Sequence, residues 1–342
     1  MHQNSTILTV RDLRKYFVVR GGLFHTAQAW VKAVDGVSLD VQRGEILGIV
    51  GESGCGKSTT ARLILRLIEP DAGEVRFEDH DVLSASSVAL KTFRRQVQMV
   101  FQDPYSSLNP RKNIEDAVAF NVLVHGYSRG EARAKTWDVL NKVGLRAEQF
   151  GRRYPHELSG GQRQRVNIAR ALVLDPKLVI LDEPVSSLDK SVQAQVLNLL
   201  QSLKNDLGLT YVFISHDLHV IEYLSDRVLV MYLGQIVEIG SAEEVSAEPL
   251  HPYTQALFAS APSMNPDERI ERPPLTGDPP NPINPPSGCR FRTRCPHAMD
   301  VCAAATPPLL PIGKTGRQVA CYLFGDSSGT GSYASATRFR AS

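Results

Sequence analysis

The sequence predicts an α/β fold built on a parallel sheet. Three short apolar runs, at 46–50, 178–181 and 211–214, have the length and composition of strands that are buried on both faces. The first run leads through a glycine-rich loop into an amphipathic helix over 60–68, and the other two runs each end in polar residues. Ligands bind at the carboxyl ends of the strands in an open α/β sheet. We therefore expect the functional site among these polar residues.

The composition indicates a large domain with a smaller one beside it. The chain has 342 residues, of which 42% are apolar, and its net charge of +2 gives no argument for nucleic acid as a partner. The sequence does not open on a basic start and an apolar run, so no signal peptide is expected. No apolar stretch approaches the roughly 18–20 residues that cross a bilayer. We expect a soluble polypeptide that can still dock on a membrane protein.

The glycine-rich loop matches the phosphate-loop pattern of glycine, four residues, glycine, lysine and serine. The glycines let backbone N–H groups turn toward phosphate oxygens, and the following helix N-terminus adds a partial positive charge. Lys57 would reach the β- and γ-phosphates, and the Ser58 hydroxyl would ligate Mg²⁺. The alternative is a glycine-rich turn that binds nothing, but the strand, the Lys-Ser pair and the helix argue against it. The predicted nucleotide-binding residues of the loop are Gly51, Ser53, Gly54, Cys55, Gly56, Lys57, Ser58 and Thr59.

Polar residues also end the second and third apolar runs. Asp182 and Glu183 follow the second run, where Asp182 would hold Mg²⁺ and Glu183 could polarise the attacking water as general base. The third run leads to His216, which could contact the γ-phosphate. Lone Asp-Glu pairs are usually solvated surface, but this pair follows four aliphatic residues in a chain with a phosphate loop upstream. We therefore interpret these three residues as functional.

Two other segments are candidates for nucleotide contacts. A strand over 7–17 ends at Tyr16 and Phe17, and either ring could stack on adenine or belong to the core. A second glycine loop opens a helix after Leu158, which predicts either a second anion site or a simple helix start. Two such sites on one chain could serve one nucleotide at a dimer interface. The residues of the second loop are Ser159, Gly160, Gly161 and Gln162.

These motifs, in this order, resemble the ATP-binding cassette ATPases over about residues 6–245. In that resemblance Gln102 is the Q-loop glutamine and a magnesium ligand, Asp189 belongs to the D-loop, and Phe17 falls at the adenine-stacking aromatic. The implied fold is a P-loop cassette: a RecA-like mixed sheet, an antiparallel β subdomain and a helical signature subdomain at about 103–160. The residues given catalytic roles are Lys57, Gln102, Glu183 and His216.

The resemblance also implies how such a chain works. Two cassettes close head to tail, and ATP is held between the phosphate loop of one and the signature residues Ser159 and Gly161 of the other. Glu183 and His216 then promote hydrolysis, and closure is transmitted to membrane subunits near 102–108. All of these motif residues are present in the sequence, so the resemblance implies a hydrolysing site.

The composition changes at about residue 246. The segment 262–286 is dense in proline, which predicts irregular or extended structure, and 325–342 is Gly-, Ser- and Ala-rich and is predicted to be disordered. Four cysteines lie between them, without the Cys-x-x-Cys spacing of ordinary zinc ribbons or bacterial ferredoxins. Chemistry alone leaves open a metal site, with His297 as a further ligand, or free buried thiols. The four are Cys289, Cys295, Cys302 and Cys321.

This extension, at 246–324, resembles that of peptide and nickel uptake ATPases, most closely the second ATPase subunit of dipeptide and oligopeptide importers. The resemblance is carried by His251-Pro252-Tyr253, by 284–289 and by the four cysteines. It implies a [4Fe–4S] cluster rather than zinc at the cysteines, and a peripheral place on the cytoplasmic face of the bacterial inner membrane. The implied partners are a paralogous second ATPase subunit, two transmembrane permease subunits and a periplasmic or extracellular solute-binding protein.

Three other functions are weighed against peptide import. The cargo could be nickel or another small solute, because the ATPase does not carry specificity. A soluble non-transport cassette ATPase usually has two cassettes in one chain or a long coiled-coil insertion, and this chain has neither. A regulatory subunit without turnover is disfavoured because Glu183 is present.

Overall fold

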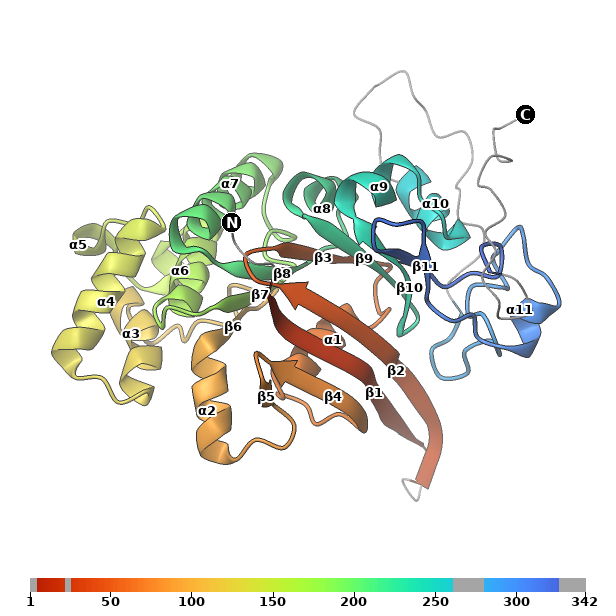
Figure 1. Ribbon diagram of the computed structural model, residues 1–342. Helices are drawn as coiled ribbons and strands as arrows, with labels where there is room; N and C mark the ends of the chain where they lie inside the picture. The colour runs from red at the N-terminus through yellow and green to blue at the C-terminus, as the bar shows by residue number, and fades with distance from the viewer. Residues whose placement is uncertain (1–4, 22–25, 261–279, 326–342) are drawn as a thin grey trace.

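The computed structural model describes residues 5–21, 26–260 and 280–325. Two sheets form the centre of the molecule, and helices cover the larger one (Figure 1). The predicted disorder of 325–342 concerns residues that, apart from Gly325, lie outside these ranges, as does most of the proline-dense segment. Among the described helices, none has the length and apolar character needed to cross a membrane.

The larger sheet has the order β11-β12-β10-β9-β3-β8-β7-β6. Its centre is parallel: β3 pairs with β8 and β9, and β7 pairs with β8 and β6. Every residue of β3, β7 and β8 is buried, as the apolar runs predicted. The bounds of the parallel strands are β3 Ile46–Val50, β6 Val97–Val100, β7 Leu178–Asp182, β8 Thr210–Ile214 and β9 Arg227–Tyr232.

The smaller sheet is antiparallel, with the order β2-β1-β4-β5. Its strands pack over α1, and their side chains form one buried cluster with α1 and with one face of β3, β7 and β8. The hairpin of the two long strands runs on into the segment 21–31, where the sequence indicated a loop or hairpin insertion. The bounds are β1 Thr6–Gly21, β2 Thr26–Gln42, β4 Ala72–Phe77, β5 His80–Asp81 and α1 Lys57–Ile64.

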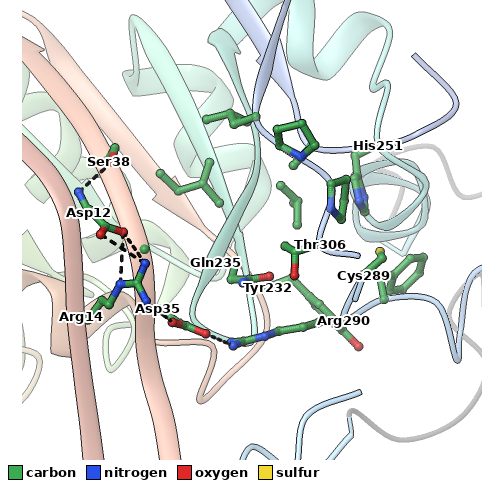
Figure 2. A pocket seen from close by; sticks show the side chains of 18 residues that line it. Asp12, Arg14, Asp35, Ser38, Tyr232, Gln235, His251, Cys289, Arg290 and Thr306 are labelled. Atoms are coloured by element: carbon green, nitrogen blue, oxygen red, sulfur yellow. Dashed lines mark hydrogen bonds and ion pairs between the residues drawn. The ribbon is translucent and has the colours of Figure 1, made fainter. Parts of the chain in front are cut away.

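The C-terminal extension continues the larger sheet. A hairpin turns at Gly234 between β9 and β10, and β12 of the extension pairs antiparallel with β10. A cavity of about 450 Å³, lined by residues such as Arg14, Asp35 and Cys289, lies between the extension and strands β1 and β2 (Figure 2). The bounds are β10 Gln235–Ser241, α9 Ala242–Ala247, α10 Pro252–Ala259, α11 Val301–Ala304, β11 Leu310–Ile312 and β12 Arg317–Val319.

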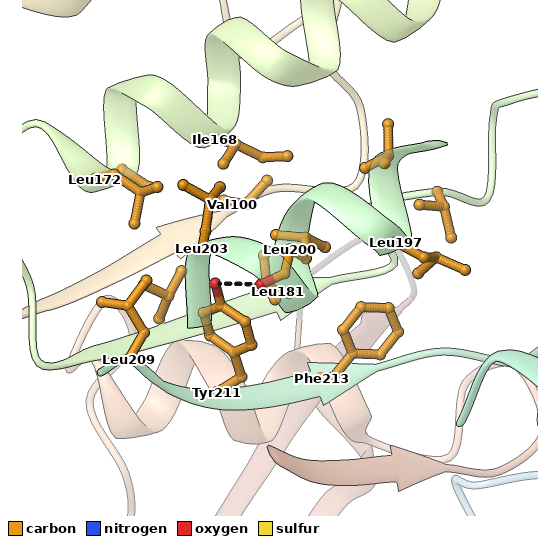
Figure 3. Close-up of a cluster of buried hydrophobic side chains, with 14 of the residues drawn as sticks. Val100, Ile168, Leu172, Leu181, Leu197, Leu200, Leu203, Leu209, Tyr211 and Phe213 are labelled. Atoms are coloured by element: carbon orange, nitrogen blue, oxygen red, sulfur yellow. Dashed lines mark hydrogen bonds between the residues drawn. The ribbon is translucent and has the colours of Figure 1, made fainter. Parts of the chain in front are cut away.

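Helices α6 and α7 cover the other face of the larger sheet. Their leucines and isoleucines meet Leu181, Tyr211 and Phe213 of the strands beneath (Figure 3). The buried Tyr211 hydroxyl donates a hydrogen bond of 3.1 Å to the carbonyl oxygen of Leu200 on α7. The bounds are α6 Gly160–Leu172, α7 Lys190–Leu207 and α8 Leu218–Leu224.

A helical subdomain lies at the end of the molecule opposite the extension (Figure 1). It follows β6 and contains the helices that Gly126 and Gly144 were predicted to separate. Each of the first two helices begins at a capping side chain, Asn113 and Ser128, that accepts a backbone N–H. The bounds are α3 Ile114–Val124, α4 Arg129–Lys142, α5 Ala147–Phe150 and the 3-10 helix η1 Pro155–Glu157, and α2 is Ser87–Gln96.

Candidate functional site

The phosphate loop is pressed between neighbouring strands. Gly51 and Gly56 have φ of 150° and 110°, and Gly54 between them also has positive φ. A Cβ on Gly51 would lie 2.2 Å from the carbonyl oxygen of Met231, and one on Gly56 would lie 2.3 Å from that of Ala33. Glycine is therefore required for both conformation and space. The loop leaves β3 and enters α1 at Lys57, as the sequence predicted.

Lys57 lies at the centre of the loop. Its ammonium group is buried and donates to the carbonyl oxygens of Gly51, at 2.6 Å, and Glu52, at 3.1 Å. Backbone N–H groups of a positive-φ glycine loop and a buried ammonium together form a concave, electropositive lining. The loop thus has the shape and charge that a polyphosphate needs.

Ser58 and Asp182 join the loop to the end of β7. The Ser58 hydroxyl donates a hydrogen bond of 2.7 Å to Asp182 Oδ1. Burial raises the pKa of the Asp182 carboxyl, and the Ser58 hydrogen bond opposes that shift. A hydroxyl and a carboxylate side by side are hard oxygen donors of the kind that Mg²⁺ takes beside substrate phosphates. The donor set therefore fits the predicted magnesium site.

Three polar side chains meet just beyond the ends of β6, β7 and β8. Glu183 Oε2 accepts a hydrogen bond of 2.9 Å from Gln102 Nε2 and lies 3.2 Å from His216 Nδ1. Glu183 has φ of 47°, in the left-handed region that non-glycine residues seldom adopt, and its N–H donates to the carbonyl oxygen of Ile214. Strained backbone of this kind concentrates at functional sites. The structure thus brings together the residues that were given catalytic roles.

Comparison with protein families agrees with this geometry. The family model described as "ABC transporter" matches residues 34–186, and the one described as "Oligopeptide/dipeptide transporter, C-terminal region" matches residues 237–302. The oligopeptide transport ATP-binding protein AppF of Bacillus subtilis is 49% identical over 94% of this chain and 98% of its own length. The dipeptide transport ATP-binding protein DppF of Escherichia coli is 48% identical over 92% of this chain and 94% of its own.

The chain belongs to the ABC transporter ATPases. Solved cassettes share its fold: cbiO1 of Clostridium perfringens has a TM-score of 0.61 and 29% identity over 72% of this chain and 92% of its own. The ATP-binding cassette MJ0796, whose title describes a dimeric post-hydrolysis state bound to ADP and Pi, has a TM-score of 0.60 and 28% identity over 69% and 98%. The predicted family, cassette fold and ATPase class are confirmed.

The signature residues of the cassette begin α6, away from the cluster around Glu183. The Ser159 hydroxyl accepts the N–H of Gln162 at 3.3 Å, and the Gln162 side chain accepts the N–H of Ser159 at 3.0 Å, which forms a capping box. Gly161 packs on Val192 of α7, and Asp189 caps that helix through the same residue's N–H. These contacts satisfy the helix starts within one chain, so the nucleotide-binding role of Ser159, Gly160, Gly161, Gln162 and Asp189 stays a prediction.

Tyr16 and Phe17 lie near the end of the described part of β1, but their surroundings differ. Phe17 is 37% exposed, which leaves ring surface for a planar ligand. Tyr16 is partly buried and its hydroxyl donates to the Asp35 carboxylate on β2. Adjacent strand residues point to opposite faces. The predicted adenine stacking therefore fits Phe17, while Tyr16 holds the strand pair together.

The predicted metal centre at the cysteines is wrong. Within the described residues, no group of three or more His, Cys, Asp or Glu side chains is placed to hold a metal ion, and this excludes the predicted [4Fe–4S] and zinc sites there. Burial raises the pKa of Cys321 to about 12 and also raises the pKa of Cys289 and Cys295. Metal binding needs thiolates, and burial among apolar groups favours the neutral thiol. Cys289, Cys295, Cys302 and Cys321 are free thiols around one small cavity, which His297 also lines.

Sequence reasoning missed the residues that support the phosphate loop from behind. The Tyr253 hydroxyl accepts the N–H of Glu52 at 2.8 Å, and the Arg294 guanidinium binds both oxygens of the Glu52 carboxylate, at 2.9 and 3.2 Å. Tyr253 belongs to the His251-Pro252-Tyr253 motif, which the sequence offered only as a resemblance. No local pattern in the sequence marks Arg294.

Proposed function

We propose that this chain is the ATP-hydrolysing, energy-coupling subunit of an importer for dipeptides or oligopeptides, bound peripherally to the cytoplasmic face of the bacterial inner membrane. The observation that carries the proposal is the meeting of Glu183 with Gln102 and His216 beside the Ser58–Asp182 pair. Peptide cargo is supported by the match of residues 237–302 to the C-terminal region of oligopeptide and dipeptide transporters, and by the names of the relatives. A nickel importer is the alternative that the test below distinguishes.

ATP is the substrate, and each part of the site handles one part of it. Phe17 stacks on the adenine, and the loop N–H groups and Lys57 bind the β- and γ-phosphates. Ser58 and Asp182, with Gln102 at the edge of the site, would hold Mg²⁺, which neutralises charge on the phosphate oxygens. These groups fix the terminal phosphate in front of Glu183.

Glu183 is the general base of the proposed reaction. Its carboxylate takes a proton from the water that attacks the γ-phosphorus, so that the oxygen of that water bonds to phosphorus as the bond to ADP breaks. Gln102 and His216 hold the carboxylate in position through Oε2, at 2.9 and 3.2 Å. His216 is exposed on the side of the γ-phosphate and can donate to it once Glu183 has received the proton.

The proposed working unit contains two cassettes. Ser159 and Gly161 are on the exposed start of α6, where a backbone N–H group at the helix N-terminus can meet the nucleotide held by a second cassette. The titles of two solved relatives describe dimers of a cassette, which supports this arrangement. We propose a paralogous cassette as the second subunit, two permease subunits docked at 102–108, and a solute-binding protein that delivers the peptide.

The test is transport by the assembled complex in vesicles. We expect peptide-stimulated ATP hydrolysis and dipeptide accumulation with the wild type, and a loss of about 10²–10⁴-fold in hydrolysis with Glu183→Gln, because the general base is removed. Glu74→Gln, at an exposed position on β4, is the matched control and should behave as the wild type. A wild type as slow as Glu183→Gln would refute the ATPase role, and accumulation of nickel without peptide would refute the cargo.

A further inference from the structure

We propose that the C-terminal extension positions the nucleotide site through two arginines, one at each end of the bound nucleotide. Arg294 pairs with Glu52 in the phosphate loop, and Arg290 pairs with Asp35, the partner of Tyr16 beside the adenine-stacking position. The inference rests on the nucleotide site proposed above. It assigns the extension a role in ATP binding in addition to any role in assembly.

Arg294 completes the contacts of Glu52. The Glu52 N–H donates to Tyr253, its carbonyl oxygen accepts from Lys57 and from the N–H of Cys55, and its carboxylate is bound by Arg294. The Arg294 side chain is 5% exposed and that of Glu52 is 22% exposed. A two-point arginine–carboxylate pair out of solvent fixes orientation as well as charge. Glu52 is therefore held on every side, and so is the start of the loop.

Arg290 acts on the adenine end of the site. Its guanidinium binds the Asp35 carboxylate and the carbonyl oxygen of Leu233 (Figure 2). Asp35 accepts the Tyr16 hydroxyl, and its N–H donates to the carbonyl oxygen of Gly234 at 2.9 Å. The N–H of Gly234 in turn donates to the carbonyl oxygen of Cys55 in the phosphate loop at 2.8 Å. Asp35 thus joins the strand of the adenine aromatic to the loop.

An aromatic anchor sets the position of both arginines. Phe291 lies between them in the sequence, is 2% exposed, and packs edge to face on Tyr232, with 5.3 Å between ring centroids, and on Tyr253, at 5.5 Å. Tyr232 ends β9, next to the hairpin that touches the loop. The segment is therefore fixed on the cassette by packing, and the two guanidinium groups are presented by a rigid element.

The charge of Glu52 makes Arg294 important for binding. ATP places several negative charges in the loop, and an unpaired carboxylate at the second loop position would repel them. With Arg294 present, the pair is neutral and the carboxylate is turned toward the extension. Loss of Arg294 adds this repulsion and also frees the loop backbone, so MgATP binding should weaken.

The experiment measures MgATP binding and turnover by the full chain in its assembled complex. Arg294→Met should weaken MgATP binding about tenfold and raise KM with kcat little changed, which is the scale expected for one charged hydrogen-bonded contact. Arg292→Met is the matched control, because Arg292 lies between the two arginines and bonds Ser287 within the extension. Arg292→Met should bind MgATP as the wild type does.

A second variant separates positioning from folding. In Glu52→Gln/Arg294→Met the unpaired charge is gone, so MgATP affinity should return to within about threefold of the wild type although the ion pair is absent. Arg290→Met should weaken ATP more than inorganic tripolyphosphate, because its arm acts at the adenine end, whereas Arg294→Met should weaken both. Equal MgATP affinity in Arg294→Met and Arg292→Met would overturn the inference, and so would the absence of rescue by Glu52→Gln.

Lys57→Ala distinguishes this inference from the proposed nucleotide site. If Lys57→Ala binds MgATP as tightly as the wild type, the nucleotide site itself is wrong. If Lys57→Ala loses binding while Arg290→Met and Arg294→Met both retain it, the site is right and only the role of the extension is wrong.

Discussion

His251 should make the stability of this cassette dependent on pH. The imidazole caps α10, is 1% exposed, and accepts the N–H of Tyr253 on Nδ1 at 3.0 Å. An acceptor nitrogen carries no proton, so the ring is neutral. Burial lowers the pKa of His251 from its ordinary 6.5 to about 3. The folded chain therefore resists protonation at this residue, and the unfolded chain does not.

The sign and size of the effect follow from linkage. Acid favours the state that binds the proton, which here is the unfolded chain with a pKa near 6.5, so stability falls as pH falls from about 6.5 toward 3. Each pH unit in that window removes about 1.4 kcal/mol. Between neutral pH and about pH 5 the unfolding free energy should drop by about 2 kcal/mol because of this histidine alone. The amount at pH 5 depends on the unfolded pKa, because the folded group has not yet titrated.

The assay is urea unfolding of the wild type and His251→Asn at neutral pH and at about pH 5. Asparagine caps helices well and does not titrate, so the variant should lose about 2 kcal/mol less than the wild type over this interval, even if it starts less stable. His80→Asn is the control, because His80 is exposed on β5, and it should follow the wild type. Parallel pH profiles for the wild type and His251→Asn would refute the reasoning.

Three further predictions concern the site and the core. Gly51→Ala should abolish MgATP binding, because its Cβ would lie 2.2 Å from a Met231 oxygen, while Gly130→Ala in open space on α4 should bind normally in the same nucleotide titration. Asp182→Asn should raise the Mg²⁺ concentration for half-maximal hydrolysis at least about tenfold, since a magnesium ligand loses its charge; an unchanged Mg²⁺ titration would exclude Asp182 as a ligand. Tyr211→Phe should lower the unfolding free energy by about 1 kcal/mol through loss of its bond to Leu200 and leave ATP hydrolysis unchanged, and a changed hydrolysis rate would contradict a purely structural role.

The centre of the fold could be predicted because its signals are local. The runs that became β3, β7 and β8 are apolar at every position, and the structure buries all of them between α1 with the smaller sheet on one face and α6 with α7 on the other. The polar residues after these runs had to meet at one edge, because parallel strands align their carboxyl ends. Glu183, Gln102 and His216 meet there.

The extension could not be predicted in the same way. Its two short strands have three residues each, too few to show alternation, and β12 exists because it pairs with β10. The cysteines are close enough in sequence to indicate a metal, but spacing does not show that burial keeps their thiols neutral. The boundary placed at residue 245 stays a prediction, since the extension shares its sheet with the cassette.

The phosphate-loop pattern itself explains why the contact with the extension was invisible. The pattern specifies glycines, lysine and serine but leaves four positions free, and Glu52 occupies the first of them. A free position is where a cassette can acquire a contact without losing the phosphate cradle, and this chain uses it for an ion pair with a residue 242 positions away. Because the loop backbone meets the nucleotide and the Glu52 side chain faces the extension, one residue serves two sites. Any force that moves the extension is therefore felt first at the loop that binds the phosphates.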